Sequence, residues 1–381
     1  MKFVVSKKRF ISALRSVLPA VGTRSTLPVL SGVRITASND GITIEGTDLE
    51  AFVREAIREE ITVEQHGGIV TPAKALAKAA ASMTTDEITV ESIDMDGHAR
   101  VVLRSGARTI TLDCLPVEDF PSALDEKTLD ELASVEAPTL ANAFARAVLC
   151  ASKDEARPPL MSVALFLKEG SSIIQLVATD SYRMGIQDVP MSEAAATNRT
   201  MLVPARVVKE LAKRLRKCRG SVSIRVPDRE RASAVVFSFG STFWSTRLIE
   251  GEFPNWQQIV PGETGAAVEF EVDEMASVLK AVKAVGNGNG TPIRLSLGQT
   301  TTLSLAEGDQ SVVSETLATA AFTPDGVGEG EVEVAFNPSF FADALKFIGD
   351  ERARLWVRDG LKPALIGPPD RRYVLMPVRL S

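Results

Sequence analysis

The residues that could carry out catalysis are few and form no recognisable set. There are only two histidines, His66 beside Gly67-Gly68 and His98 after a turn signal, and neither has a cysteine nearby. Zinc sites usually combine histidine and cysteine ligands at short spacing. The sequence therefore predicts no metal centre.

Two carboxylate motifs and one glycine-rich segment have a chemical and a structural interpretation. Asp94-x-Asp96-Gly97 resembles the start of a calcium loop but lacks the later ligands, so we favour a hairpin turn. Asp180 and Arg183 could pair an acid with a base, but Asp48 repeats the aspartate without the arginine, which favours a structural loop carboxylate. Gly286–Gly290 lacks the strand and the Lys-Ser/Thr of a phosphate-binding loop, and we expect a turn. The sequence predicts neither an enzyme nor a cofactor.

Basic side chains recur on one face of a predicted helix. They lie at i, i+3, i+7, i+10 and i+11, beside an apolar stripe of Val207, Val208, Leu211, Leu215 and Cys218; the basic residues are Arg206, Lys209, Lys213, Arg216 and Lys217. Lys74 and Lys78 begin the same pattern in an earlier helix, and Lys280 and Lys283 lie on a later one. A solvated charged face is the alternative. The repetition favours an electropositive surface that contacts phosphates without reading bases.

A strand that meets a proline and runs into a helix occurs three times, and it positions these basic residues. The prolines are Pro72, Pro204 and Pro338, and their spacing is nearly constant (204 − 72 = 132; 338 − 204 = 134). We expect each proline in the first helical turn, where its missing N–H has no partner to lose. Thr47-Asp48 and Thr179-Asp180 keep the same spacing (179 − 47 = 132). A fixed period predicts three copies of one domain.

Each copy also opens in the same way, with a strand and an amphipathic helix. These segments are Lys2–Val21, Ser134–Ser152 and Ala267–Val285. Asn39-Asp40-Gly41 and Asp96-Gly97 predict hairpin turns. The last strand is interrupted by Pro377, so we expect it to be an edge strand or to leave its sheet there.

The bulk composition is typical of a globular protein. The chain has 381 residues, of which 45% are hydrophobic and 24% charged, and its net charge is −6. No apolar run approaches the ~20 residues of a membrane span, and the start lacks a signal-peptide pattern. Three scattered cysteines, Cys114, Cys150 and Cys218, favour a cytoplasmic protein with buried thiols. The net negative charge taken alone argues against a nucleic-acid partner, but an average misleads where the charges are segregated along the chain.

Several segments together resemble the bacterial DNA sliding clamp, the beta subunit of the replicative DNA polymerase III. They occur in the family's order along the whole chain: Met1-Lys2-Phe3, Arg24–Leu30, Ala178–Met184, Glu250–Pro254 and Tyr373–Leu380. The resemblance implies an α+β fold of three repeated DNA-clamp domains, at residues 1-122, 123-255 and 256-381. Each domain is expected to pack two helices on antiparallel sheet.

The resemblance also implies a head-to-tail homodimer that forms a six-domain ring, with the helices lining the inside and the sheets outside. A head-to-tail contact forms a closed ring only where the rotation between neighbouring subunits brings the last subunit back to the first. The family's interface corresponds here to Ile110 and Leu112 of the first domain against Ala284 and Val285 of the third. The alternative is that these four residues belong to ordinary cores.

The implied function is that of a processivity factor, which encircles double-stranded DNA and tethers the polymerase. The implied DNA-binding residues are Arg24, Lys74, Lys78, Arg206, Lys209, Lys213, Arg216, Lys217, Lys280 and Lys283. A clamp that slides needs contact without sequence preference, which loosely held cations provide. Some clamps carry aromatic residues where Pro159 and Leu160 stand here, so that secondary DNA contact is not expected.

Partners are implied to bind by a short apolar peptide in a pocket between the second and third domains. These partners are the replicative polymerase alpha subunit, the clamp loader complex, and other clamp-binding proteins such as repair and translesion polymerases, ligase and mismatch-repair proteins. Flexible methionines and a mostly apolar cleft suit such binding. The matching residues are Met161, Thr179, Ser181, Tyr182, Met184, Pro254, Ile259, Leu361, Pro363, Val374, Met376, Pro377, Val378 and Arg379. Tyr182 and Pro363 differ from other clamps. Core packing is the alternative for Met184, Ile259 and Val374.

The leading hypothesis is thus a non-catalytic clamp of the cytoplasm, associated with the nucleoid. One alternative is a specialised paralogue for repair or drug tolerance, which the sequence does not separate from the replicative clamp. Another is a three-domain scaffold that binds peptides but never encircles DNA. Ring closure and basic helices facing DNA distinguish the clamp from the scaffold.

Overall fold

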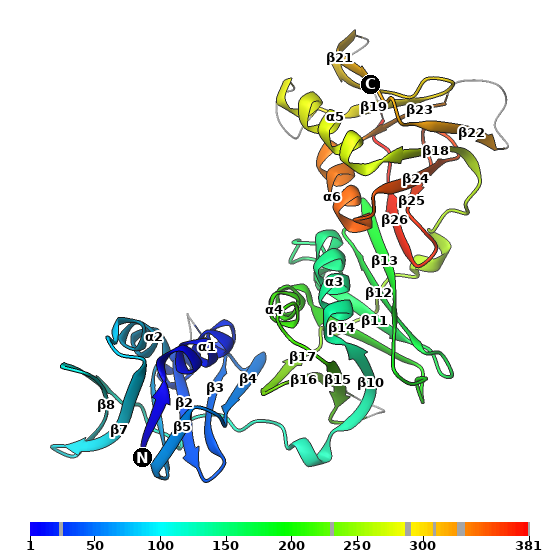
Figure 1. Ribbon diagram of the computed structural model, residues 1–381. Helices are drawn as coiled ribbons and strands as arrows, with labels where there is room; N and C mark the ends of the chain where they lie inside the picture. The colour runs from blue at the N-terminus through cyan, green and yellow to red at the C-terminus, as the bar shows by residue number, and fades with distance from the viewer. Residues whose placement is uncertain (23–25, 229–231, 286–290, 308–309, 326–331, 380–381) are drawn as a thin grey trace. The chain divides into compact units, whose positions relative to one another are not determined.

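The computed structural model describes residues 1–22, 26–228, 232–285, 291–307, 310–325 and 332–379 (Figure 1). The chain divides into two compact units. The first contains residues 1–138 and 217–248, and the second contains residues 139–216 and 249–381. The second sequence repeat contributes to both units, so each unit is described by itself.

The first unit contains two antiparallel sheets. A five-stranded sheet has the order β5-β1-β7-β8-β9, with β1 (Lys2–Ser6), β5 (Ile61–Gln65), β7 (Glu87–Met95), β8 (His98–Ser105) and β9 (Arg108–Asp113). An eight-stranded sheet has the order β10-β15-β16-β17-β4-β3-β2-β6. Its strands are β2 (Gly32–Ser38), β3 (Gly41–Thr47), β4 (Ala51–Ile57), β6 (Gly67–Pro72), β10 (Asp130–Glu136), β15 (Ser221–Val226), β16 (Ala234–Phe239) and β17 (Thr242–Arg247).

The second unit also contains two antiparallel sheets. A nine-stranded sheet has the order β14-β11-β12-β13-β26-β25-β24-β18-β22, with β11 (Ser162–Leu167), β12 (Ile173–Thr179), β13 (Arg183–Pro190), β14 (Arg199–Pro204), β18 (Gly265–Glu271), β22 (Ala321–Asp325), β24 (Arg352–Val357), β25 (Ala364–Ile366) and β26 (Arg371–Leu375). A four-stranded sheet has the order β21-β20-β19-β23, with β19 (Ile293–Leu297), β20 (Thr302–Glu307), β21 (Gln310–Thr316) and β23 (Val332–Phe336).

Two helices accompany each repeat and bury an apolar face against the sheets. They are α1 (Lys7–Val17), α2 (Ala73–Ser82), α3 (Ala137–Ala147), α4 (Ala205–Leu215), α5 (Val272–Val285) and α6 (Pro338–Ile348). In α1 the buried residues are Phe10, Ala13, Leu14 and Val17, which recur at helical spacing. Phe10 meets Phe3 of β1 edge to face, with ring centroids 6.2 Å apart. The fold thus follows from apolar stripes at helical spacing beside strands of alternating burial.

The three prolines do not all lie where the sequence predicts them. Pro338 is the first residue of α6, and the Asn337 side chain accepts hydrogen bonds from two N–H groups of the first turn. Pro72 and Pro204 instead close their strands and precede α2 and α4 as the N-cap residue. The expectation of a first-turn proline is therefore correct once and wrong by one residue twice. A proline is tolerated at the last residue of a strand, because no further backbone N–H of that strand has to pair with its neighbour.

The repeats join through strands of the same kind. In the first unit β4 pairs with β17, and Phe52 is opposite Ser245. In the second unit β13 pairs with β26, and Met184 is opposite Val374. The two pairs are related by nearly the same offset on both sides (184 − 52 = 132; 374 − 245 = 129). Both junctions thus use the same register. β26 ends before Pro377, as expected, but it is an inner strand, between β25 and β13.

Candidate functional sites

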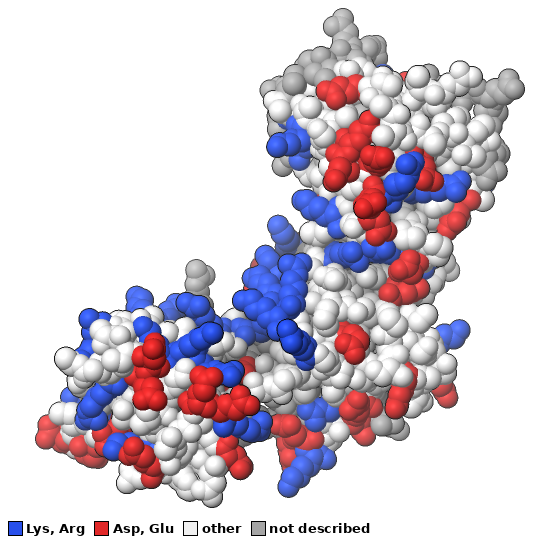
Figure 2. Space-filling model, in the orientation of Figure 1, with Lys and Arg blue, Asp and Glu red and all other residues white. Residues whose placement is uncertain are grey.

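Helix α4 carries basic side chains on its exposed face. Val207, Val208, Leu211, Ala212 and Leu215 are buried, whereas Arg206, Lys209 and Lys213 are exposed. Figure 2 shows Lys and Arg side chains gathered over this helix. The helix ends at Leu215, so Arg216 and Lys217 are exposed just beyond its end rather than on the helix. Cys218, expected in the apolar stripe, also lies beyond the helix and is half-buried.

The remaining predicted basic residues also lie on helices. Lys74 and Lys78 are exposed on α2, and Lys280 is exposed on α5. Lys283 is half-buried, and its Nζ lies 3.2 Å from Ser339 Oγ of α6. Both α5 lysines line a cavity of about 460 Å³ between α5 and α6, together with Lys346. Arg24 lies outside the described residues, as does the Gly286–Gly290 segment.

A tight turn between β12 and β13 holds the first residues of the predicted peptide pocket. Thr179 Oγ1 donates to the Arg183 carbonyl at 2.7 Å, and Asp180 Oδ1 accepts from the N–H groups of Tyr182 and Arg183 at 3.0 Å each. Ser181 has a left-handed backbone, with φ of +78°. This geometry projects Tyr182 outward, where it is 61% exposed. The aspartate is thus a structural turn residue, as the sequence predicts.

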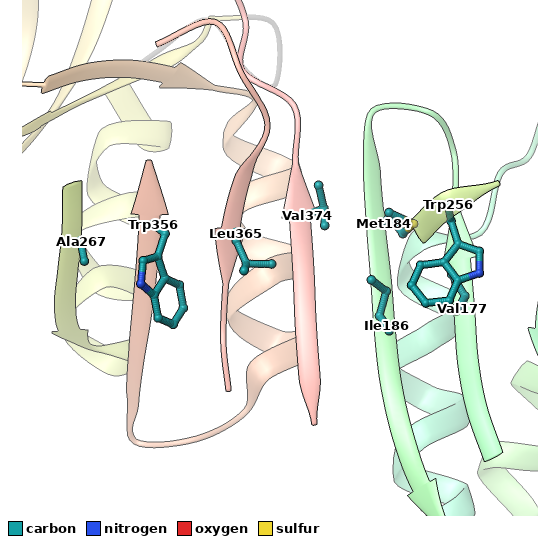
Figure 3. Packing of buried hydrophobic residues seen from close by; sticks show 8 residues of the cluster. All are labelled: Val177, Met184, Ile186, Trp256, Ala267, Trp356, Leu365 and Val374. Carbon is teal, nitrogen blue, oxygen red and sulfur yellow. The ribbon is translucent and has the colours of Figure 1, made fainter. Parts of the chain in front are cut away.

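An apolar cluster continues from this turn across the nine-stranded sheet. It consists of Val177, Met184, Ile186, Trp256, Ala267, Trp356, Leu365 and Val374, with Phe166, Phe253 and Val260 packed against it. Figure 3 shows the strand residues on neighbouring strands, on the sheet face away from the helices. Met184 and Val374 belong to the predicted pocket and are buried. Both side chains therefore pack in the core of the sheet, as the core-packing alternative expects.

Four large apolar side chains of the predicted set are exposed in the same unit. Tyr182 is 61% exposed, Ile259 49%, Leu361 65% and Met376 37%. Pro254, Ser181 and Arg379 are also exposed, and Met161, Thr179, Pro363, Pro377 and Val378 are half-buried. Exposed apolar groups on a surface of this kind are typical of protein interaction sites.

The segment after β26 brings part of this set together around a cavity. The Met376 N–H donates to the Tyr182 carbonyl at 2.9 Å, and the Val378 N–H donates to the Ala335 carbonyl at 2.8 Å. A cavity of about 510 Å³ beside this segment is lined by Leu361, Val378 and Arg379 of the predicted set, with Glu333, Val334, Ala335 and Gly360. Three of the fourteen predicted residues thus line this cavity, and four of its residues were not predicted.

Sequence reasoning also missed the two tryptophans of the apolar cluster. Trp256 lies in a short 3-10 turn, Trp256–Gln258, between the predicted residues Pro254 and Ile259. It packs against Phe166, with ring centroids 5.9 Å apart. Its position two residues after Pro254 was the signal that could have identified it. No local signal points to Trp356 or Glu333, because they reach this region through strand pairing.

A largely enclosed cation, Arg183, with a side chain that is 12% exposed, belongs to the turn between β12 and β13. Arg183 Nε is 2.9 Å from Asp180 Oδ2, and Nη1 is 2.6 Å from Asp343 Oδ2 of α6. Its guanidinium lies 4.4 Å from the centroid of the Phe340 ring. Burial opposes the charge of Arg183, but Tyr373 and Asp343 outweigh it and raise the pKa of the guanidinium. The side chain therefore stays charged and links the turn to α6.

The predicted interface residues lie on an edge strand and a helix. Ile110 and Leu112 are half-buried on β9, an edge of the five-stranded sheet. Ala284 is exposed near the end of α5, and the side chain of Val285 lies outside the described part of the chain. The four-stranded sheet has β21 as an edge.

The described residues contain no group of three or more His, Cys, Asp or Glu side chains that could hold a metal ion. Asp94 Oδ1 accepts from the Gly97 N–H at 2.9 Å, which makes this motif a hairpin turn. Within the described ranges, no helix has the length and apolar character to cross a membrane.

Within the described residues, six α-helices and antiparallel sheets in three repeats define a three-domain DNA clamp. Family models for the N-terminal, central and C-terminal domains of the DNA polymerase III beta subunit match residues 1–125, 134–255 and 257–379. The chain therefore belongs to the DNA polymerase III beta subunit family.

Individual relatives agree with this family. The beta sliding clamp of Bacillus subtilis is 25% identical over 391 residues, with both chains fully covered. The beta sliding clamp homolog GriR of Streptomyces muensis is 26% identical and covers 100% of this chain and 99% of its own. The crystal structure of the Bacillus subtilis DNA polymerase sliding clamp has a TM-score of 0.90 at 23% identity, with full coverage of both chains.

The predicted family and the three-domain α+β clamp fold are confirmed, and a dimeric ring is consistent with this family. The predicted role as a processivity factor of DNA replication, a sliding clamp, is confirmed as well. Proteins of this family are generally non-catalytic. The identity to the homolog GriR (26%) is nearly equal to the identity to the Bacillus subtilis clamp (25%), and the interpretation as a sliding clamp stands.

Proposed function

We propose that two copies of this chain close head to tail into a ring around double-stranded DNA, with domains near residues 1-122, 123-255 and 256-381. We base this on the strands that join the repeats. β4 of the first repeat pairs with β17 of the second, and β13 of the second pairs with β26 of the third. The equivalent strands still at sheet edges are β21 of the third repeat and β9 of the first. A β21–β9 contact between chains continues the same series.

Burial on β9 supports this contact. The β8–β9 and β16–β17 hairpins both have two-residue turns, with Ser105 opposite Arg108 and Phe239 opposite Thr242. Ile110 therefore corresponds to Trp244, which is 1% exposed where β17 is paired on both sides. Ile110 itself is only half-buried in the single chain. A second chain beside β9 would bury it, because exposed edge strands favour pairing.

Sedimentation at several concentrations tests the ring. One chain has a mass of 40.9 kDa, and a ring of two chains has twice that mass. We expect the dimer mass for the wild type and a shift towards the single-chain mass for the double variant Ile110→Asp/Leu112→Asp. Leu49→Asp, at another exposed leucine of the same unit, is the control and should remain dimeric. A single-chain mass for the wild type at every concentration would support the scaffold instead.

We infer that the helices face the DNA and that their cations contact phosphates. The supporting feature is the exposed face of α4, with Arg206, Lys209 and Lys213, and its counterparts on α2 and α5. Each phosphate contact steepens the dependence of log K on log salt by about 0.9. Reversal of these three residues to glutamate should lower that slope by roughly 2–3 per chain and abolish processive synthesis.

A charge-matched control separates this effect from net charge. Lys127, Lys153 and Lys168 are exposed and lie outside the six α-helices named above, and their reversal to glutamate changes the charge equally. We expect this control to load and slide normally. Equal losses in both triple variants would contradict the assignment to α4.

We also infer that the pocket of the second unit binds the polymerase alpha subunit, the clamp loader and other partners by an apolar peptide. The protein would act in the cytoplasm at the nucleoid, as a non-catalytic clamp without a cofactor. The support is the exposed apolar set near the turn and the cavity beside Val378. Deletion of Met376–Ser381 removes the segment that bonds to Tyr182 and Ala335. Stimulation of the polymerase should disappear while the dimer mass remains, and unchanged stimulation would contradict the pocket.

A further inference from the structure

The turn that presents Tyr182 has a geometric twin at the other junction between repeats. Thr47 Oγ1 donates to the Ala51 carbonyl at 2.8 Å, and Asp48 Oδ1 accepts from the N–H groups of Glu50 and Ala51 at 3.0 and 2.7 Å. Leu49 has φ of +73°, close to the +78° of the serine in the second turn. These values match the turn between β12 and β13 bond for bond.

The bond to the next repeat is repeated too. The Arg247 N–H donates to the Glu50 carbonyl at 2.8 Å, and the Met376 N–H donates to the Tyr182 carbonyl at 2.9 Å. Glu50 and Tyr182 are therefore equivalent positions (182 − 50 = 132), as are Arg247 and Met376 (376 − 247 = 129). The backbone hydrogen bonds of the two turns are the same, so the side chains at these equivalent positions distinguish the two turns.

The side chains at these two positions differ in kind. At the first junction Glu50 and Arg247 form an exposed ion pair, with 3.8 Å between Oε1 and Nη1. At the second junction the same positions carry an exposed aromatic ring and an exposed methionine. Exposed ion pairs stay hydrated and offer an apolar peptide no favourable surface.

The Tyr182 ring is held in place from below. It stacks on Phe340 of α6, with ring centroids 6.3 Å apart and planes at 26°. Phe340 in turn lies under the Arg183 guanidinium, which two carboxylates hold in place. A ring that is braced on one face and 61% exposed elsewhere is already ordered before a partner arrives. Such preorganisation lowers the entropy lost on binding.

We propose that Tyr182 is the specificity-determining residue of the pocket and that its free face stacks on an aromatic side chain of the partner peptide. This inference rests on the proposed peptide pocket. Aromatic rings in offset or edge contact contribute roughly two- to tenfold in affinity beyond the area that they bury. Because the twin turn carries an ion pair, we expect that the first junction does not compete for the same peptides.

The test measures binding of the replicative polymerase alpha subunit from the same organism to the full-length clamp by surface plasmon resonance. Tyr182→Phe keeps the ring and should bind as the wild type does. Tyr182→Leu keeps an apolar side chain without a ring and should raise Kd about two- to tenfold. Tyr182→Glu, which copies the twin turn, should raise it further. Phe340→Leu removes the brace and should weaken binding by less than Tyr182→Leu.

The outcomes separate the two proposals. Failure of the wild-type clamp to bind the polymerase would overturn the proposed pocket itself. Equal Kd values for the wild type and Tyr182→Leu would overturn the stacking inference and leave the pocket standing. Glu50→Ala is the matched control at the twin turn, and a loss of affinity there would overturn the assignment of specificity to one junction. Thermal unfolding of each variant confirms that it remains folded.

Discussion

Removal of the Arg183 cation should destabilise the second unit more than any nearby change of charge. The side chain is 12% exposed and makes ion pairs with Asp180 at 2.9 Å and Asp343 at 2.6 Å. Loss of one partner of a buried pair costs about 3–5 kcal/mol, because the remaining charge has no counter-ion. The two carboxylates are 15% and 22% exposed, so water reaches them in part. We therefore expect Arg183→Met to lower the free energy of unfolding by about 2–4 kcal/mol.

The temperature shift follows from the size of the unit. For a unit of roughly 200 residues, each kcal/mol lowers Tm by about 2–4 °C, so the expected loss is about 5–15 °C. Methionine keeps an apolar contact with Phe340 but loses the cation above its ring, which adds to the cost. Circular dichroism during heating, at fixed protein concentration, measures the shift.

Two variants of the same network supply the controls. Asp343→Ala leaves Arg183 paired with Asp180 and should cost about 1–2 kcal/mol, less than loss of the cation. Lys346 pairs with the same Asp343 but is 67% exposed, so Lys346→Ala should cost about 0–0.5 kcal/mol. If Arg183→Met shifted Tm no more than Lys346→Ala, the reasoning from burial would be refuted.

Three further outcomes follow from local contacts. Gly185→Ala should lower the free energy of unfolding by about 1–3 kcal/mol, because a Cβ there would lie 2.4 Å from Phe347. Gly68→Ala is the control, because a Cβ at this strand glycine would lie 3.7 Å from the nearest atom beyond its chain neighbours. Equal Tm values for the two variants would contradict the prediction. A threonine hydroxyl and two backbone N–H groups lower the pKa of Glu274, so its stabilisation is present above the unfolded pKa and is lost as the pH falls through the folded pKa. The Tm advantage of the wild type over Glu274→Gln should shrink between pH 6 and pH 3, and a constant difference would speak against this. Burial raises the pKa of the Cys150 thiol, so iodoacetamide at pH 8 should label it only after unfolding, as read by mass spectrometry; labelling of the native protein at the rate of a free thiol would contradict it.

Much of the fold could be predicted because its signals are local. The constant period of the repeats, the apolar stripe of α4 and the Thr-Asp turns are each read from short stretches of the chain. Gly41 and Gly97 have positive φ angles of +112° and +77°, and both belong to hairpin-turn motifs that the sequence identifies. Pro72 and Pro204 lie one residue before the predicted first helical turn, because the end of the strand and the start of the helix meet at the same position.

The candidate site was predictable in part for the same reason. Tyr182 and Met376 follow from a local turn and a chain ending that match the family. Glu333, Gly360 and Trp356 carry no comparable local signal. They belong to strands, or to a turn beside them, whose neighbours are set by pairing across long stretches of sequence, and a one-residue slip would turn each strand side chain to the other face.

The sequence by itself determined the three repeats, the helices with basic faces and the turns that present Glu50 and Tyr182. Only the tertiary structure decided how the repeats join, with Phe52 opposite Ser245 and Met184 opposite Val374. The physical reason is range. Helical periodicity and turns depend on bonds between residues close in the chain, whereas strand pairing joins positions far apart in the chain (245 − 52 = 193; 374 − 184 = 190) and depends on the packing of the whole sheet.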